Sequence, residues 1–268
     1  MLKPLPKIRS GLRPLSWVYG LAVEFRNNLF DTGVLQQKEY PIPIICVGNL
    51  TVGGTGKTPH IEYLIRLLSD KYKVAVVSRG YKRKSNYLQV VQTNSDVNRV
   101  GDEPLQMKLK YPKTIIVVDK DRRNAIDYLL KQTKDQQPDV ILLDDGYQHR
   151  YVKPSLTILL MDSNRPIYED ALLPAGNLRE PIRRKDRASI VVVTKCGENM
   201  QPINFRIIAN GLDLFPFQSL YFTNFVYHRL QPVFPSLNKE TYSLDDIRKK
   251  HVLLLAGIAS TKSLVEKL

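Results

Sequence analysis

Short apolar runs alternate with amphipathic segments between residues 42 and 195. The runs are rich in β-branched residues and show little polar alternation, which is typical of strands covered on both faces. They occupy residues 42–49, 73–80, 114–120, 140–145, 156–162 and 189–195. Apolar residues recur at helical spacing from Ile61 to Leu68, and residues 121–134 show a similar face. The alternation predicts an α/β core in which helices flank a parallel sheet on both faces.

The two ends of the chain differ from this core. Residues 1–38 combine basic side chains with an apolar stripe, which predicts an amphipathic helix whose continuity Pro14 and Gly20 limit. Residues 213–250 are rich in aromatics and prolines, which predicts an antiparallel β-ribbon or a linker. Residues 251–258 resemble a buried strand again, and the chain ends in a helix-like segment without a capping signal. We therefore expect a smaller C-terminal lobe that continues in a longer protein, and divide the chain into 1–38, 39–212 and 213–268.

The net charge favours an anionic partner. Forty Lys and Arg against 26 Asp and Glu give a charge of +14, which suits a nucleotide, a phospholipid or a nucleic acid. The sequence contains no RRM, KH or zinc-finger pattern, so we do not expect nucleic-acid binding. Cys46 and Cys196 lie in apolar runs without metal-ligand spacing, as core thiols of a reducing compartment would. No run reaches the roughly 18 apolar residues that span a bilayer, and the start lacks a secretory cleavage site. We expect the catalytic body to be cytoplasmic.

The strongest motif is a glycine-rich segment between the first apolar run and the helical pattern, where a phosphate-binding loop would lie. It comprises Thr51, Val52, Gly53, Gly54, Thr55, Gly56, Lys57 and Thr58. In such a loop the backbone N–H groups surround phosphate oxygens, the lysine reaches the β- and γ-phosphates, and the last hydroxyl binds Mg²⁺. Thr51 replaces the usual first glycine, so the loop turns there with a β-branched residue or relies on Gly53 and Gly54. A glycine-rich turn with a chance Gly-Lys-Thr is the alternative, which the strand–loop–helix pattern disfavours.

A second motif is acidic and supports the first. The apolar run 140–145 ends in Asp144 and Asp145, so these carboxylates emerge where the ligands of open α/β sheets bind. A Mg²⁺ ion needs one or two such oxygen ligands from the protein. A local Asp-Asp-Gly turn is the alternative interpretation. With the glycine-rich loop, the motif predicts a fold of the P-loop NTPase type that binds ATP and Mg²⁺.

Five segments in a fixed order resemble the tetraacyldisaccharide 4'-kinases of lipid A synthesis. They are VGNLTVGGTGKTP (47–59), SRGY (78–81), VGDEP (100–104), DDGYQH (144–149) and LPAGNLREP (173–181). The resemblance covers nearly the whole chain. It implies ATP- and Mg²⁺-dependent phosphorylation of the 4'-hydroxyl of a tetraacylated glucosamine disaccharide 1-phosphate, a glycolipid. It also implies a peripheral or monotopic position on the cytoplasmic face of a bacterial inner membrane.

The resemblance implies a catalytic role for Asp102, which matches the carboxylate that the family is proposed to use as general base. From the sequence alone, Asp102 also suits the N-cap of a helix, and the two roles are compatible. Lys57 and Asp145 complete the expected catalytic set. The candidates for substrate contact are Arg79, Glu103, His149, Arg179 and Glu180. Arg122, Arg183 and Arg184 are further candidates for a phosphate partner. A solvated arginine or a structural histidine is the alternative at these positions.

The predicted N-terminal helix would suit an anionic membrane surface. Its apolar stripe comprises Leu15, Val18, Ala22, Phe25 and Leu29, with Trp17 and Tyr19 beside it. A basic helix with aromatics lies flat in the headgroup layer. A helix packed on the core is the alternative, but a lipid substrate favours the membrane.

A membrane-associated regulatory ATPase or GTPase switch is the alternative to a metabolic kinase. Such an ATPase usually carries a second lysine before the Gly-Gly pair of its loop, where this chain has Val52. A GTPase needs Thr-Lys-x-Asp after a late strand, and the segment from Thr194 to Gly197 lacks the aspartate. Both features favour the kinase.

Overall fold

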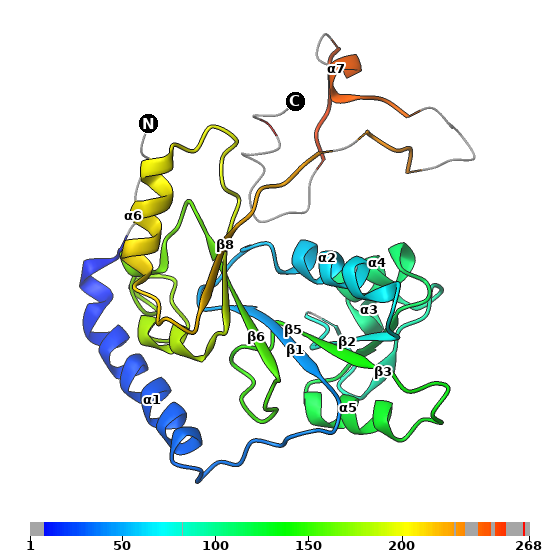
Figure 1. Cartoon of the computed structure of the whole chain (residues 1–268), viewed down its shortest axis with the longest axis horizontal. Helices are drawn as coiled ribbons and strands as arrows, with labels where there is room; N and C mark the ends of the chain where they lie inside the picture. Colours follow the sequence, from blue (N-terminus) through cyan, green and yellow to red (C-terminus); the bar gives the residue numbers. More distant parts are fainter. Residues whose placement is uncertain are drawn as a thin grey trace. The chain divides into compact units, whose positions relative to one another are not determined.

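Eight strands form one sheet in the N-terminal unit of the chain, as the computed structural model shows (Figure 1). The structure describes residues 8–81, 83–227, 229–233, 241–247, 250–255 and 265. The chain divides into two units, Met1–Thr223 and Asn224–Leu268. The strands are β1 (Ile44–Asn49), β2 (Val74–Ser78), β3 (Gln89–Val90), β4 (Ile115–Val118), β5 (Val140–Asp144), β6 (Leu156–Asp162), β7 (Ile190–Thr194) and β8 (Ser219–Phe222). The α-helices are α1 (Arg13–Asp31), α2 (Lys57–Ser69), α3 (Val97–Val100), α4 (Asp102–Lys110), α5 (Arg122–Leu130), α6 (Pro202–Leu212) and α7 (Leu244–Ile247), and the 3₁₀-helices are η1 (Ser10–Leu12), η2 (Ile167–Glu169) and η3 (Ile182–Arg187).

The six predicted strands are confirmed, and the sheet is mostly parallel. Its order is β3-β4-β2-β5-β1-β6-β7-β8, and only the β3–β4 pair is antiparallel. The strand β1 lies between β5 and β6, with Val47 opposite Asp144 on one side and Ile158 on the other. All parallel strands end at the same edge of the sheet, so the loops that follow β1, β5, β6 and β7 meet there.

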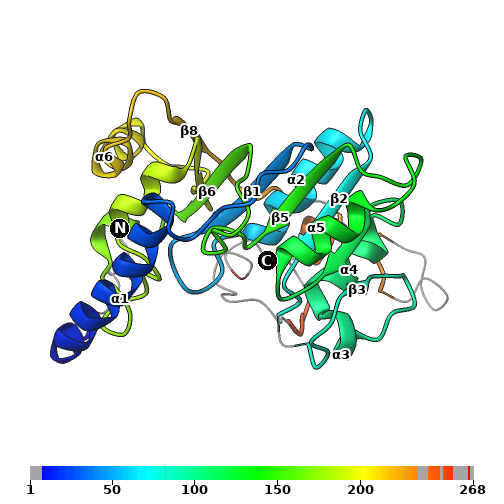
Figure 2. The ribbon, with the colours of Figure 1, turned by 90° about the horizontal axis from the view of Figure 1, so that it is seen from below.

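Helices cover both faces of the sheet, as predicted. On one face, Ile61 and Ile65 of α2 and Met107 of α4 pack against buried strand residues. On the other, Ile126 of α5 and Leu212 of α6 belong to two further buried clusters. In both ribbon views, α1 and α6 lie toward the β8 end of the sheet, and α4 and α5 lie toward the β3 end (Figures 1 and 2). The α/β class with a mostly parallel, P-loop-like sheet is therefore confirmed.

The helix α1 is continuous, so the prediction that Pro14 and Gly20 limit it is wrong. Pro14 stands in the first turn, where a missing N–H costs nothing. Gly20 lies against Leu172, whose Cδ1 would be 2.8 Å from an added Cβ. This close approach explains why a residue without a side chain occupies the middle of the helix.

The side of α1 that faces the protein is mainly polar, with Phe30 as its one buried hydrophobic residue. The Ser16 hydroxyl donates to the carbonyl of Leu172 and accepts from the amide of Ala175, both at 2.9 Å. The Tyr19 hydroxyl donates to the carbonyl of Arg179, and Asn27 donates to the buried Glu180 carboxylate. These bonds attach α1 to residues 172–180. Five large apolar residues of the helix instead face outward: Leu15, Trp17, Val18, Leu21 and Phe25 are 58–79% exposed.

The structure differs from the sequence predictions at two places in the C-terminal part. Residues Ser219–Phe222 form the strand β8, which pairs in parallel with β7 at the sheet edge and not in an antiparallel ribbon. The alternative, a linker within residues 213–250, stays a prediction. Residues 251–255 form no strand and are largely exposed, because no strand among the described residues pairs with their backbone. Residues 256–264 lie outside the described part of the chain. In the second unit, the described residues form α7 and one antiparallel bridge between Leu230 and Tyr242.

Candidate active site

The glycine-rich loop connects the C-terminal end of β1 to the start of α2. Thr51 is extended and buried, and it forms an antiparallel bridge with Leu178. The loop turns instead at Gly53, with φ +100°, and at Gly56, with φ +86°, values that favour glycine. The loop therefore does not turn at Thr51, which replaces the usual first glycine. A β-branched residue suits the extended backbone of the bridge at this position. The segment 173–181 also holds the loop, because the Val52 amide donates to Asn177 and the Arg179 amide to Leu50.

Lys57 and Asp145 meet between the loop and the end of β5. The Lys57 ammonium lies 3.6 Å from the Asp145 carboxylate, and the Arg179 guanidinium lies 3.2 Å from it. Burial alone would raise the pKa of Asp145, but the charges of Lys57 and then Arg179 outweigh it and lower the pKa below its ordinary value. A carboxylate at this position therefore stays ionised. A phosphate bound by the loop would meet two cations here.

Asp144 has an unused oxygen in a buried setting. Its side chain is almost fully buried, and one carboxylate oxygen accepts from the Ser78 hydroxyl at 3.0 Å. The other oxygen is buried and has no hydrogen-bond partner. Burial, and then the charge of Asp145, raise the pKa of Asp144. An ionised Asp144 therefore requires a cation, since unpaired buried charges are costly.

The same edge holds two more carboxylates at the start of α4. Gly101 is the N-cap residue of α4, so the interpretation of Asp102 as the cap is wrong by one residue. Asp102 and Glu103 stand in the first turn, where the helix dipole favours negative charge. Burial, followed by the charges of Asp144 and Asp102, raises the pKa of Glu103. The acidic groups of α4 and β5 thus interact.

These residues fit a Mg²⁺ ion shared with a bound phosphate. The described residues contain no group of three or more His, Cys, Asp or Glu side chains placed to enclose a metal. Magnesium does not need one, because phosphate oxygens and water usually complete its octahedral shell. The orphaned oxygen of Asp144 and the half-buried Thr58 after the loop supply ligands of the required hard type.

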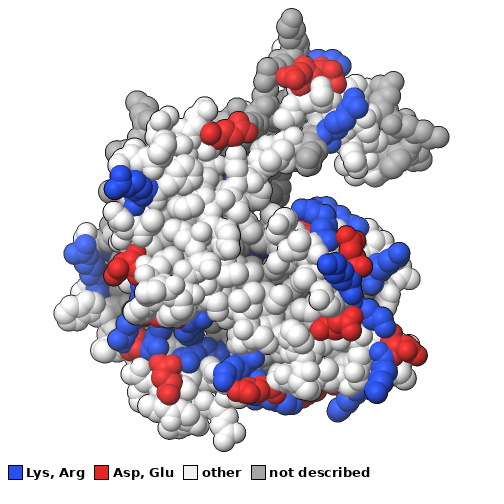
Figure 3. Space-filling model, in the orientation of Figure 1, with Lys and Arg blue, Asp and Glu red and all other residues white. Residues whose placement is uncertain are grey.

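The candidate basic residues Arg79, Arg122 and His149 differ in burial and in hydrogen-bond or ion-pair partners. Arg79 is exposed just after β2, whereas Arg122 is buried and donates to the Asp145 carbonyl at 3.3 Å. His149 lies 3.7 Å from Asp121, and burial, followed by the charge of Arg122, lowers its pKa to about 4. His149 is therefore neutral at pH 7. On the face in Figure 3, Lys and Arg are interspersed with Asp and Glu, so the excess charge is not gathered in one patch there.

Three further candidates have structural partners. Glu180 is 2% exposed and accepts from Asn27 and from Arg187. Arg183 and Arg184 pair with Glu24 of α1. These contacts connect α1 to the segment that supports the glycine-rich loop.

The sequence interpretation missed several residues that hold the loop. Thr194, the last residue of β7, donates to the Thr55 carbonyl, and Lys195, just after the strand, donates to the Gly54 carbonyl. Asn49 donates to the Thr55 hydroxyl at 2.9 Å. The Thr194-Lys195 pair was the available signal, but it was considered only as half of a guanine motif.

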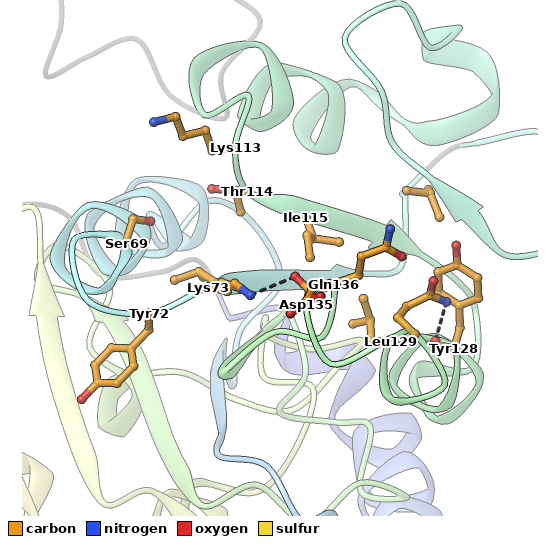
Figure 4. A pocket seen from close by; sticks show the side chains of 13 residues that line it. Ser69, Tyr72, Lys73, Lys113, Thr114, Ile115, Tyr128, Leu129, Asp135 and Gln136 are labelled. Atoms are coloured by element: carbon orange, nitrogen blue, oxygen red, sulfur yellow. Dashed lines mark hydrogen bonds between the residues drawn. The ribbon is translucent and has the colours of Figure 1, made fainter.

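One cavity of the structure lies away from this chemistry. It measures about 560 Å³ and is lined by Lys73, Val74 and Ile115 at the N-terminal ends of β2 and β4 (Figure 4). The Lys73 ammonium there donates to the Asp135 carbonyl at 2.9 Å (Figure 4). The glycine-rich loop and its acids stand at the opposite, C-terminal edge of the sheet. This cavity is therefore separate from the candidate active site.

Known proteins resemble this chain along almost its whole length. Residues 8–268 match the family described as tetraacyldisaccharide-1-P 4'-kinase. The chain is 50% identical over 265 residues to a tetraacyldisaccharide 4'-kinase of Phocaeicola vulgatus, covering 98% of this chain and 72% of the relative. It is 50% identical over 268 residues to that of Bacteroides thetaiotaomicron, covering 98% and 70%. The crystal structure of LpxK from Aquifex aeolicus in complex with ATP is similar, with 32% identity, a TM-score of 0.64 and 82% of each chain covered.

Proposed function

This chain belongs to the tetraacyldisaccharide-1-phosphate 4'-kinase family. On that basis we propose which of its residues bind ATP and Mg²⁺ and which residue accepts the proton of the acceptor. It is a kinase that uses ATP to phosphorylate the lipid A precursor. The observation that carries the proposal is the meeting of Lys57 with Asp145 at 3.6 Å, beside the buried Asp144. This arrangement joins a phosphate-binding loop to the acids of a neighbouring strand.

The loop from Gly53 to Thr58 holds the triphosphate by its backbone amides. Lys57 exchanges its contact with Asp145 for the β- and γ-phosphates. Arg179 stands on the other side of Asp145 and supplies a second positive charge. Thr58, Asp144 and Asp145 would hold Mg²⁺, which would neutralise phosphate charge during transfer.

Asp102 is the general base in this proposal. Its carboxylate takes the proton of the 4'-hydroxyl while that oxygen bonds to the γ-phosphorus and the bond to the β,γ-bridging oxygen breaks, which releases ADP. Glu103 stands beside it in the same turn, and burial together with the neighbouring carboxylates raises its pKa, which favours the protonated form of Glu103. The exposed Arg79 is suited to a phosphate of the acceptor, and the neutral His149 to a hydrogen bond near it.

The test is a transfer assay with the full-length protein in detergent. We expect label from γ-labelled ATP to enter the tetraacylated disaccharide 1-phosphate at its 4'-position, and transfer to stop when EDTA removes Mg²⁺. An acceptor without the 4'-hydroxyl is the control. Label found only as inorganic phosphate or on protein would favour the regulatory ATPase. Transfer that persisted in EDTA would contradict the proposed role of Mg²⁺.

The outward face of α1 supports the proposal that the enzyme lies on an anionic membrane surface. None of the helices in the described part of the chain has the length and apolar content that crossing a bilayer requires. Trp17, Val18 and Phe25 are 79%, 66% and 66% exposed, although they are large and apolar. A helix held to the protein by a polar face and presenting an apolar one fits the headgroup layer. The cytoplasmic leaflet, which carries the lipid substrate's reacting end, is the proposed location.

The double variant Trp17→Ala and Phe25→Glu is expected to bind anionic phospholipid vesicles at least about tenfold more weakly. It removes apolar surface that the lipid would bury, and it adds a negative charge. Activity on detergent-dispersed substrate should stay within about twofold, since neither residue faces the sheet. Co-sedimentation with vesicles measures the first effect. Leu109→Glu, at a 56% exposed position of α4, is the matched control and should bind normally. Unchanged vesicle binding by the double variant would contradict a membrane role for this face.

A further inference from the structure

A second cavity lies beside the connection from β5 to β6. It measures about 290 Å³, and its lining includes Cys46, Leu143 and Thr157, which occupy paired positions on the neighbouring strands β1, β5 and β6. Cys46 and Leu143 belong to the buried cluster that contains α5, whereas α2 packs in the cluster on the other face of the sheet. No residue of the glycine-rich loop lines this cavity. It is therefore separate from the candidate active site.

The cavity is lined by three cationic side chains and, among the described residues, by no acidic one. Arg150 and Lys153 come from the connection between β5 and β6, and Arg187 comes from the end of η3. Cys46 adds no negative charge, because burial raises the pKa of its thiol to about 12. An anion inside the cavity would therefore meet only cationic and neutral side chains.

Arg187 has a buried hydrogen-bond donor that no described residue accepts. One Nη atom of its guanidinium donates to the Glu180 carboxylate at 2.7 Å, and the guanidinium lies over the Tyr147 ring, 4.4 Å from its centre. The other Nη atom is buried and has no partner in the described part of the chain. An unpaired buried donor is costly, and more so when it belongs to a charged group. This Nη atom therefore favours an acceptor from outside the protein.

Arg150 is in a similar position. Its side chain is 9% exposed, and its Nη atoms donate to Asn27 and Asp31 of α1, while its Nε is buried and without a partner among the described residues. Burial lowers the pKa of Arg150, the hydrogen bond to Asp31 partly offsets this, and the charge of Arg187 lowers the pKa again. The two guanidinium groups thus repel each other. An anion bound to both would remove that repulsion.

A phosphate group suits these donors better than water or a carboxylate. The cavity has room for far more than one water molecule, whose share of liquid volume is about 30 Å³, and water would bring no charge. Guanidinium groups bind phosphate oxygens through paired hydrogen bonds. The two arginines come from different segments, and a tetrahedral phosphate offers oxygens in several directions, whereas a carboxylate offers two in one plane. The remaining room beside Leu143, Val152 and Pro154 suits a small organic group.

We propose that this cavity is a binding site for a phosphate group, either free phosphate or a small phosphomonoester, held by Arg150 and Arg187. Lys153, which is 57% exposed and paired with Glu39, stands at the entrance and adds to the attraction. The site is additional to those for ATP and for the glycolipid, and it does not depend on the roles proposed above. Gly146 lines the cavity and directly follows Asp145, so a bound phosphate would stabilise the segment next to this acid.

Isothermal titration calorimetry of the full-length protein tests this site, with Mg²⁺ and a non-hydrolysable ATP analogue added to occupy the glycine-rich loop. We expect inorganic phosphate and glycerol 3-phosphate each to bind saturably, and acetate not to bind at the same concentrations. Gln37 is half-buried and lines the cavity, so Gln37→Glu places a carboxylate there and should weaken phosphate binding at least about tenfold. Gln36→Glu adds the same charge at the neighbouring exposed position and should bind phosphate normally.

Two further variants separate this cavity from the glycine-rich loop. Arg187→Gln should weaken phosphate binding about tenfold, and a thermal melt shows whether it folds without the ion pair to Glu180. If it does not fold, Gln37→Glu still tests the site. Lys57→Ala removes the cation of the loop and should leave phosphate binding in the cavity unchanged.

Three results would overturn the inference: no phosphate binding by the unaltered protein, equal binding by the folded Gln37→Glu and Gln36→Glu, or binding that is lost in Lys57→Ala and kept in Gln37→Glu. Tighter binding of glycerol 3-phosphate than of phosphate would identify a phosphomonoester as the occupant, and the reverse would identify the free anion. Failure of the transfer assay with normal phosphate binding would contradict the proposed function and leave this site in place.

Discussion

Replacing Lys57 with alanine is expected to lower phosphoryl transfer about a thousandfold or more, as removal of a fixed positive group at a developing charge does. The Lys57 side chain is 17% exposed and lies at the start of α2, between the loop and Asp145. Arg179 also pairs with Asp145, but it lies outside the glycine-rich loop and does not replace the Lys57 ammonium there. Turnover of labelled ATP by the full-length protein measures the effect.

The control for Lys57→Ala is Lys71→Ala, an exposed lysine just beyond the other end of the same helix. It should keep the normal rate. Removing Lys57 also leaves Asp145 with Arg179 as its nearest cation, so a thermal melt should accompany the assay. Full turnover by a folded Lys57→Ala would contradict the role of the loop in phosphate binding.

Asp102→Asn is expected to lower kcat between about a hundredfold and ten-thousandfold while the Kd for ATP changes by no more than about threefold. Asparagine keeps the size of the side chain and removes its ability to take a proton. Asp102 stands in the first turn of α4 after Gly101, and the helix should form in either case. Single-turnover kinetics and equilibrium binding of ATP together measure the two quantities.

Asp96 provides a matched control for this variant. It is the N-cap of the neighbouring helix α3, and its carboxylate accepts from the Asn98 amide at 2.9 Å. Asp96→Asn should lower the melting temperature slightly at most and leave kcat unchanged, since asparagine also caps helices. If Asp102→Asn kept the normal kcat, Asp102 would retain only its favourable position at the start of a helix.

Much of the core could be predicted from the sequence, because each buried strand is an uninterrupted apolar run, which is a local feature of the sequence. The run 140–145 is apolar at every position before its two acids, and β5 is buried along its full length. The loop from Gly53 to Lys57 was placed correctly between a strand and a helix for the same reason, since its glycines and flanking patterns are local features.

Long-range contacts were harder to predict. The role of Thr51 depends on Leu178, and the orientation of α1 depends on hydrogen bonds from Ser16 and Asn27 to residues about 150 positions away. An apolar stripe on a helix indicates that one side avoids water, but not whether protein or lipid covers it. The parallel pairing of β8 likewise depends on β7 and not on its own composition.

The polar attachment of α1 has a consequence for how this enzyme can vary. The residues that fix the helix to the catalytic body, such as Ser16 and Asn27, are distinct from those that face outward, such as Trp17 and Phe25. The inner side of α1 therefore has to keep its hydrogen bonds to the protein, whereas the outer side is free of that requirement. In the membrane association proposed above, the outer residues can therefore change with the lipid composition of the surface while the inner residues keep the helix in place.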